Sequence, residues 1–73
     1  MNKSNPYKEA FLWNEEYPKP GLKVRYWTGV REGEGKVSFT RTKANVLGDH
    51  TAVLWVEGES GCVALSHVEV ERP

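Results

Sequence analysis

From Gly21 onward, apolar and polar residues alternate in short runs that are separated by turn residues. This period of two is typical of β-strands, because successive side chains of a strand point to opposite faces. Residues 23–27 and 36–42 alternate in this way. Three further runs, at residues 51–57, 62–65 and 68–71, are short and rich in apolar residues. We therefore expect about five short strands.

The same patterns predict which side chains face the core. In the run 36–42 we expect the apolar residues to point inward and the polar ones outward: Val37 and Phe39 against Lys36, Ser38 and Thr40. The run 51–57 is apolar without alternation, which favours a central strand covered on both sides. The N-terminal segment or a second subunit would supply that cover.

Turn residues separate the expected strands. Three glycines predict a loop over residues 28–35, and residues 48–50 and 57–61 are typical of tight turns. Residues 66–68 are expected to form one short helical turn with Ser66 as its cap.

We expect two parts in the chain: an N-terminal arm over residues 1–20 and a single barrel over residues 21–73. The arm differs from the barrel in its pattern of apolar residues. Within the arm, apolar residues recur at the spacing of one or two turns of amphipathic helix, and Pro18 ends any helix at or before Tyr17. Such a short helix is marginal in isolation. It should either pack on the body through Phe11 and Trp13, or offer them to a partner.

The composition limits the classes of function. Seventy-three residues make one domain, and ten Lys and Arg balance ten Asp and Glu, which argues against a strongly basic nucleic-acid binder. Cys62 is the single cysteine, so no internal disulfide forms, and we expect no metal and no cofactor. With no apolar run long enough for a membrane span and no signal core at the N-terminus, a cytoplasmic location is expected.

Short strands and glycine-rich turns favour a small closed barrel, since closure removes unprotected strand edges. The strand order resembles the Src-homology-3-like (SH3-like) barrel, above all at residues 63–70, where a strand, a short turn and a valine-rich last strand follow each other. Gly21-Leu22-Lys23-Val24 with the later Gly33, Gly35 and Val37 is similar to the KOW-type version of this barrel, found in proteins of transcription and translation. The predicted fold class is thus all-β, a small five-stranded SH3-like barrel with a short N-terminal arm or helical turn.

The chain also resembles the plasmid-borne type II dihydrofolate reductases in size and in the shape expected of its fold. In that family a Val-Gln-Ile-Tyr stretch lines the active site, and the matching residues here are Val63-Ala64-Leu65-Ser66. The resemblance therefore implies the shape without the polar groups of the reductase site. The small, stand-alone character of the chain is similar to that of proteins of phages and mobile elements.

Charge is unevenly distributed along the chain. Residues 19–43 hold seven Lys and Arg against two Glu, whereas residues 44–73 hold one Arg against five Asp and Glu. Cations interleaved with an aromatic ring suit single-stranded nucleic acid, since lysine and arginine bind phosphates and the ring stacks on a base. Our first functional prediction is low-specificity nucleic-acid binding, through Lys23, Arg25, Trp27, Arg31, Lys36 and Arg41. The alternative for this basic region is that its cations pair with Glu69 and Glu71 of the last strand.

The second functional prediction is a protein-interaction module, either a phage-type modulator of a host protein or a homo-oligomer. It uses the aromatic side chains of the N-terminal arm to bind its partner: Tyr7, Phe11, Trp13 and Tyr17. Neither prediction makes the chain an enzyme. Cys62, His50 and His67 lack a third orienting group at a recognisable spacing, so we expect no catalytic residues.

Overall fold

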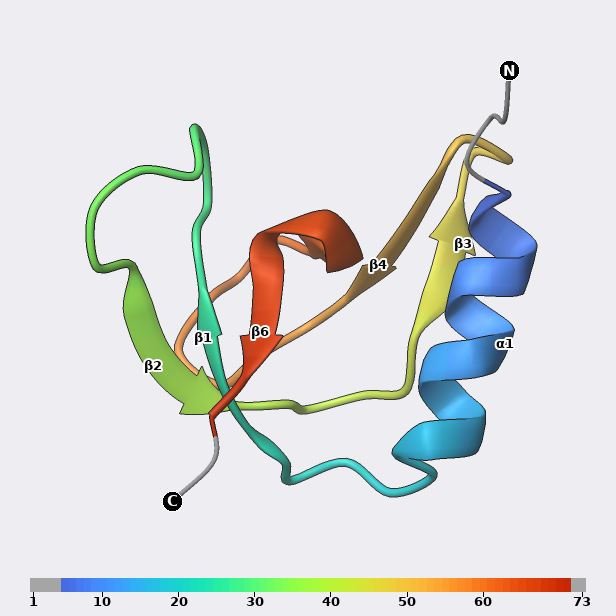
Figure 1. Cartoon of the computed structure of the whole chain (residues 1–73), viewed down its shortest axis with the longest axis horizontal. Coiled ribbons are helices and arrows are strands. Elements are labelled where there is room, and N and C mark those ends of the chain that lie inside the picture. The colour runs from blue at the N-terminus through green and yellow to red at the C-terminus, as the bar shows by residue number, and fades with distance from the viewer. Residues whose placement is uncertain (1–4, 72–73) are drawn as a thin grey trace.

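The computed structural model describes residues 5–71, and within them it contains one α-helix, six short β-strands and one turn of 3-10 helix. In chain order these are α1 (Pro6–Glu16), β1 (Lys23–Tyr26), β2 (Lys36–Phe39), β3 (Asn45–Leu47), β4 (Thr51–Leu54), β5 (Val63–Ala64), η1 (Leu65–His67) and β6 (Val68–Val70). The strands form two antiparallel sheets, in the orders β2-β1-β6 and β3-β4-β5. Figure 1 shows β2 at one end of the long axis and α1, beside β3, at the other.

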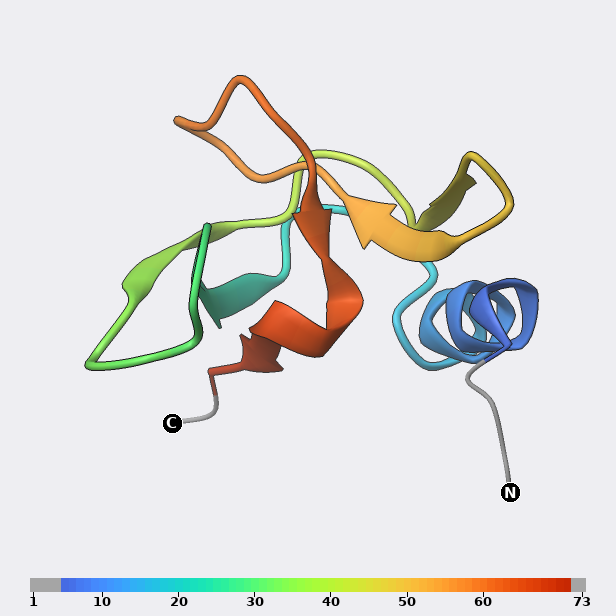
Figure 2. The ribbon, with the colours of Figure 1, turned by 90° about the horizontal axis from the view of Figure 1, so that it is seen from above.

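The predicted five-stranded, all-β barrel is wrong, because the fold is mixed α/β and its two sheets do not close into a barrel. An isolated bridge between Thr40 and Val56 joins the two sheets. Figure 2 shows β2 and β3, the outer strands of the two sheets, on opposite sides of the molecule. The strands are two to four residues long, and among the described residues no ladder pairs a strand of one sheet with a strand of the other. The helix instead covers β3 and β4, so closure is not needed to bury their inner face.

The helix α1 forms because its two ends, capped by Asn5 and Tyr17, are specified locally. The Asn5 side chain accepts hydrogen bonds from the backbone N–H groups of Tyr7 (3.0 Å) and Lys8 (3.1 Å), and Pro6 occupies the first turn. At the other end the helix stops before Pro18, and the Tyr17 N–H donates to the Trp13 carbonyl oxygen at 2.7 Å. The predicted helix in the N-terminal arm is therefore present, and with eleven residues it is longer than the one or two turns predicted.

Small side chains bring α1 close to the second sheet. Ala10 on the helix packs with Ala44 and Ala52, and all three are buried. Trp13 contacts this cluster and also a second, larger core that is described below. Phe11, which was predicted to pack beside Trp13, is exposed. The helix thus shares its core with the strands.

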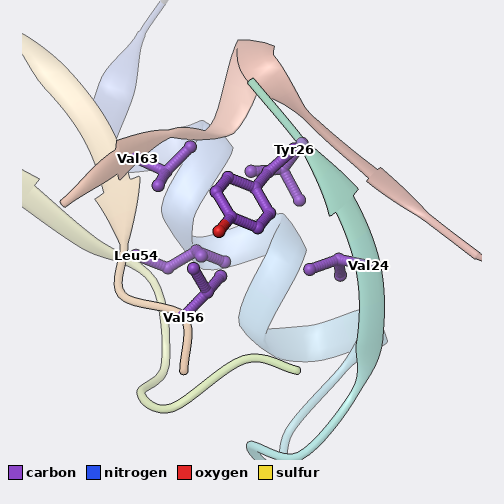
Figure 3. Close-up of a cluster of buried hydrophobic side chains, with 6 residues drawn as sticks. Val24, Tyr26, Leu54, Val56 and Val63 are labelled. Atoms are coloured by element: carbon purple, nitrogen blue, oxygen red, sulfur yellow. The ribbon is translucent and has the colours of Figure 1, made fainter. Parts of the chain in front are cut away.

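The larger core lies between the two sheets. Its buried members are Val24, Tyr26, Leu54, Val56, Val63 and Val68. In Figure 3 the ring of Tyr26 reaches from β1 toward Leu54 and Val56. The strand β4 is the middle strand of its sheet, and its successive residues Ala52, Val53 and Leu54 are all buried, so the central strand predicted within residues 51–57 is confirmed for residues 51–54. Helix α1 covers one of its faces.

The predicted facing of β2 is reversed. Val37 and Phe39 are 42% and 49% exposed, whereas Thr40 is 4% exposed. The register explains this, because Ser38 lies opposite the core residue Val24 and so shares its face. The buried Thr40 hydroxyl oxygen accepts hydrogen bonds from the N–H groups of Gly21 and Leu22, both at 3.0 Å.

The turn predicted at residues 48–50 is confirmed and joins β3 to β4. Residues 57–61 lie within a longer connection from β4 to β5, residues 55–62, and are not the tight hairpin turn that the sequence predicts. The predicted short helical turn is η1, but its cap position is Ala64 and not Ser66. Within residues 5–71, no helix has the length and apolar character that a membrane span requires.

Candidate functional site

The outward side of the sheet β2-β1-β6 carries side chains in three columns, one for each strand. Cross-strand neighbours on the same face are Lys23 with Phe39, Arg25 with Val37, and Arg25 with Glu69. The backbone N–H of Glu71 donates to the Lys23 carbonyl oxygen at 3.0 Å, which extends the third column. We call these six residues the sheet face: an apolar column (Val37, Phe39), a basic column (Lys23, Arg25) and an acidic column (Glu69, Glu71).

Arg25 is held in place on this face by two contacts. Its Nε lies 3.0 Å from Glu71 Oε2, and its Nη1 donates to the Glu34 carbonyl oxygen at 2.7 Å. Lys23 is exposed, and its ammonium has no ion-pair partner among residues 5–71. The two cations of the basic column therefore differ, since only Lys23 presents an uncompensated charge.

Trp27 and Arg31 lie just beyond the end of β1 and bind each other. The Arg31 guanidinium is 4.5 Å from the centre of the Trp27 ring, which is a cation–π contact. Arg31 also pairs with Glu69 and donates to the Ser66 carbonyl oxygen at 2.9 Å, while Trp27 Nε1 donates to the Gly33 carbonyl oxygen at 3.2 Å. One face of the indole is thus occupied by the chain's own arginine.

The last two residues of the predicted basic surface gather around Glu59, away from the sheet face. Lys36 Nζ is 3.4 Å from Glu59 Oε2, and Arg41 Nη2 donates to the Glu59 carbonyl oxygen at 3.3 Å. The same carboxylate accepts a hydrogen bond from the Tyr26 hydroxyl at 3.1 Å. Burial and this hydrogen bond raise the pKa of Tyr26 above 10.0.

The six residues predicted to bind nucleic acid therefore do not form one free basic surface. Lys23 and Arg25 share the sheet face, Trp27 and Arg31 stack on each other and line one groove together with Arg25, and Lys36 and Arg41 flank Glu59. The predicted pairing of cations with the acidic last strand is confirmed for Arg25 and Arg31.

An open groove of about 460 Å³ lies between the β1–β2 loop and the last strand. It is lined by Arg25, Trp27, Arg31, Gly33, Glu34 and Glu69. Two guanidinium groups and two carboxylates balance each other in this lining, so the groove favours neither an anion nor a cation.

The predicted partner-binding aromatics of α1 divide into two pairs. Trp13 and Tyr17 are half-buried, with ring centres 4.7 Å apart. Tyr7 and Phe11 are exposed, and Phe11 is 61% exposed. The Tyr7 hydroxyl donates to Asp49, and this hydrogen bond raises the pKa of Tyr7.

Sequence reasoning missed the apolar residues that are exposed beside the predicted ones. Val37 and Phe39 alternate correctly, but alternation does not say which face is inward, and only the register with β1 does. The inward hydroxyls of Ser38 and Thr40 each bond a backbone group, which the strand pattern does not reveal: Ser38 Oγ donates to the Glu57 carbonyl oxygen at 2.7 Å, and Thr40 Oγ1 accepts from the Gly21 N–H at 3.0 Å. Leu12, 53% exposed, was also missed.

Residues 5–71 contain no cluster of three or more His, Cys, Asp or Glu that could hold a metal ion. Cys62 is a free, half-buried thiol.

Comparison with protein-family models, with curated proteins and with solved structures finds no match to this chain. The resemblance to SH3-like, KOW-type and type II reductase families, and to phage proteins, stays a prediction.

Proposed function

We propose that this chain is a non-enzymatic protein-interaction module, and that its sheet face binds an acidic segment of another protein that carries apolar side chains. One observation supports this most directly: Val37 and Phe39 lie exposed beside Lys23, whose charge has no partner among the described residues.

The apolar column supplies affinity for a protein. Val37 and Phe39 occur two residues apart on the same face of β2, so their side chains are adjacent. Burying a valine or phenylalanine side chain fully contributes roughly 1.5–3 kcal/mol. Aromatic residues are also enriched at the centres of protein interfaces.

The charges of the sheet face indicate the sign of the partner. Arg25 is neutralised by Glu71, and Glu69 is neutralised by Arg31. The uncompensated charge on the sheet face is therefore that of the Lys23 ammonium. A carboxylate placed beside the apolar side chains of the partner would complement it.

The acidic column favours a protein over nucleic acid. Adjacent strands lie about 4.8 Å apart, so Glu69 and Glu71 are next to the basic column. These carboxylates pair with Arg31 and Arg25, so the ammonium of Lys23 is left as the unpaired cation of the sheet face. A strand of nucleic acid carries a phosphate on every nucleotide and needs several free cations, whereas a peptide can place a single carboxylate over Lys23. Nucleic-acid binding, our first prediction from the sequence, is accordingly the less favoured function.

The proposal is tested with a labelled peptide in which glutamate and phenylalanine alternate. We expect it to bind the full chain, and Phe39→Ser and Lys23→Gln each to weaken binding at least several-fold. Val30→Ser is the matched control, because Val30 is exposed in the β1–β2 loop and lies outside the sheet face.

Three further probes separate the alternatives. A lysine–phenylalanine peptide tests the sign of the charge, a glutamate–serine peptide tests the apolar column, and oligo-deoxythymidine tests nucleic acid. The proposal is overturned if the lysine peptide binds as well as the glutamate peptide, if Phe39→Ser leaves the affinity unchanged, or if the oligonucleotide alone binds at low salt.

A further inference from the structure

The outward side of α1 carries the kind of segment that the sheet face is proposed to bind. Phe11 and Leu12 are 61% and 53% exposed. Glu15 follows Phe11 by four residues and Leu12 by three, so its carboxylate is a neighbour of both on the helix surface. Among residues 5–71 no ion pair involves Glu15. This outer patch of Phe11, Leu12 and Glu15 thus combines two apolar side chains with an unpaired carboxylate.

The rest of α1 adds negative charge to this side of the molecule. The helix Pro6–Glu16 holds Glu9, Glu15 and Glu16 against Lys8. The two surfaces are therefore complementary in both respects: apolar side chains on each, an excess of carboxylates on α1, and the ammonium of Lys23 on the sheet face.

Resting on the proposed function of the sheet face, we infer that the segment it binds is helix α1 of a second copy of this chain. Phe11 and Leu12 of one copy pack on Val37 and Phe39 of the next, and Glu15 pairs with Lys23.

The positions of the two surfaces determine the kind of assembly. Figures 1 and 2 show α1 and β2 at opposite ends of the molecule, so a chain cannot fold its own helix onto its own sheet face. Each copy then offers two surfaces: the outer patch of α1, which we call the donor surface, and the sheet face, which we call the acceptor surface. Such a head-to-tail contact produces a ring if the rotation between copies closes, and an open series of copies if it does not.

The size of the contact places it among weak interactions. A stable interface buries about 800 Å² on each partner, about one sixth of the 5156 Å² surface of this chain. Three side chains on one helix and three on a sheet cover less than that. The association is therefore expected at concentrations above the micromolar range.

The test uses full-length variants in which one surface is removed at a time. The wild-type chain is expected to show an average mass that rises with concentration in sedimentation equilibrium. Phe39→Asp, which removes the acceptor surface, and Phe11→Asp, which removes the donor surface, should each remain monomeric. An equimolar mixture of the two variants should form a dimer and nothing larger, because each variant keeps the surface that the other has lost.

Charge reversal gives a second, independent measurement. Lys23→Glu and Glu15→Lys should each weaken self-association, and mixing these two variants should restore it in assemblies of alternating copies, because every contact between unlike copies again joins a glutamate to a lysine. Val30→Asp is the control for adding a charge to an exposed apolar position elsewhere. Circular dichroism of every variant confirms folding, and Val37→Asp and Leu12→Asp replace any variant that does not fold.

The inference is overturned if the wild-type chain stays monomeric up to about 1 mM, or if the mixed variants fail to pair. If the glutamate–phenylalanine peptide still binds in that case, the proposed function stands and its partner is another protein. If neither the peptide nor a second copy binds, both the inference and the proposed function fail.

Discussion

Gly35 lies directly against the indole of Trp27. A Cβ atom added at residue 35 would be 2.7 Å from Trp27 Cε2 and 2.7 Å from the Tyr26 carbonyl oxygen. The backbone of Gly35 also has a φ of +68°, which L-residues with a side chain rarely adopt. The close approach of loop and indole therefore requires glycine at this position.

We predict that Gly35→Ala destabilises the fold by about 2–3 kcal/mol, because the new methyl group meets backbone as well as a ring. Gly33→Ala is the matched control. Its φ is +76°, but an added Cβ would meet nothing within 4 Å, so it should cost about 1 kcal/mol. Urea unfolding measures both, and equal losses would show that the contact with Trp27 has no effect on stability.

Asn14 connects α1 to the chain between β2 and β3. Its amide Nδ2 donates to the Ala44 carbonyl oxygen at 3.0 Å, and its Oδ1 accepts from the Ala44 N–H at 2.9 Å. Asn14→Ala should cost roughly 1–3 kcal/mol in urea unfolding, since both backbone groups of the buried Ala44 lose their partner. Glu16→Ala, at an exposed position of the same helix, is the control and should change stability little. Similar losses for the two variants would contradict this role.

Ionisation of Tyr26 should lower the free energy of unfolding at alkaline pH. Burial, followed by its hydrogen bond to Glu59, raises the pKa of Tyr26 above 10.0, so folding favours the neutral phenol. The stabilisation is fully present below the unfolded-state pKa of 10.0 and is lost as the pH rises through the higher folded-state pKa. Urea unfolding from about pH 8 to about pH 11 should therefore show a decline that Tyr26→Phe reduces.

A matched background makes that measurement specific. The pKa of Tyr7 is also raised, chiefly by its hydrogen bond to Asp49, so the comparison is made in a Tyr7→Phe background. At neutral pH, Tyr26→Phe should cost about 1 kcal/mol through the lost hydrogen bond. An alkaline decline of the same slope with and without the Tyr26 hydroxyl would refute the assignment.

The positions of five of the six strands along the chain were predictable from the sequence, whereas their arrangement in two sheets that do not close into a barrel was not. Alternation and glycine-rich turns located β1, β2 and the strands from β4 onward, because these signals are local. The strand β3 was missed, since its three residues carry no alternation long enough to detect. The packing of α1 depends on Ala10 meeting Ala44 and Ala52, which are distant in sequence and small.

At the candidate site, too, the sequence shows the local excess of charge but not the distant residues that pair with it. The excess of cations in residues 19–43 is real, but its effect is decided by partners from the other half of the chain. Arg25 bonds to Glu71, which is 46 positions away, and Arg31 bonds to Glu69. Charge counted along the sequence therefore overestimated the basic surface that the fold presents.

Trp13 and Phe11 lie on the same helix but should respond differently to truncation. Trp13 packs against both core clusters and against Tyr17, whereas Phe11 points into solvent. Trp13→Ala should therefore cost about 3 kcal/mol, a large share of the stability of a domain this small. Phe11→Ala should change the stability of the monomer by less than about 0.5 kcal/mol.

Deleting residues 1–20 should destabilise the strands, for the same reason as Trp13→Ala. Helix α1 completes the core, so its removal should affect the strands that remain. We expect the β4 amides of the remaining chain to lose their protection in hydrogen exchange. Urea unfolding of Trp13→Ala and Phe11→Ala, measured at a concentration where the chain is monomeric, gives the matched comparison. A truncated chain that keeps the exchange protection of β4 would show that the strands form their core without the helix.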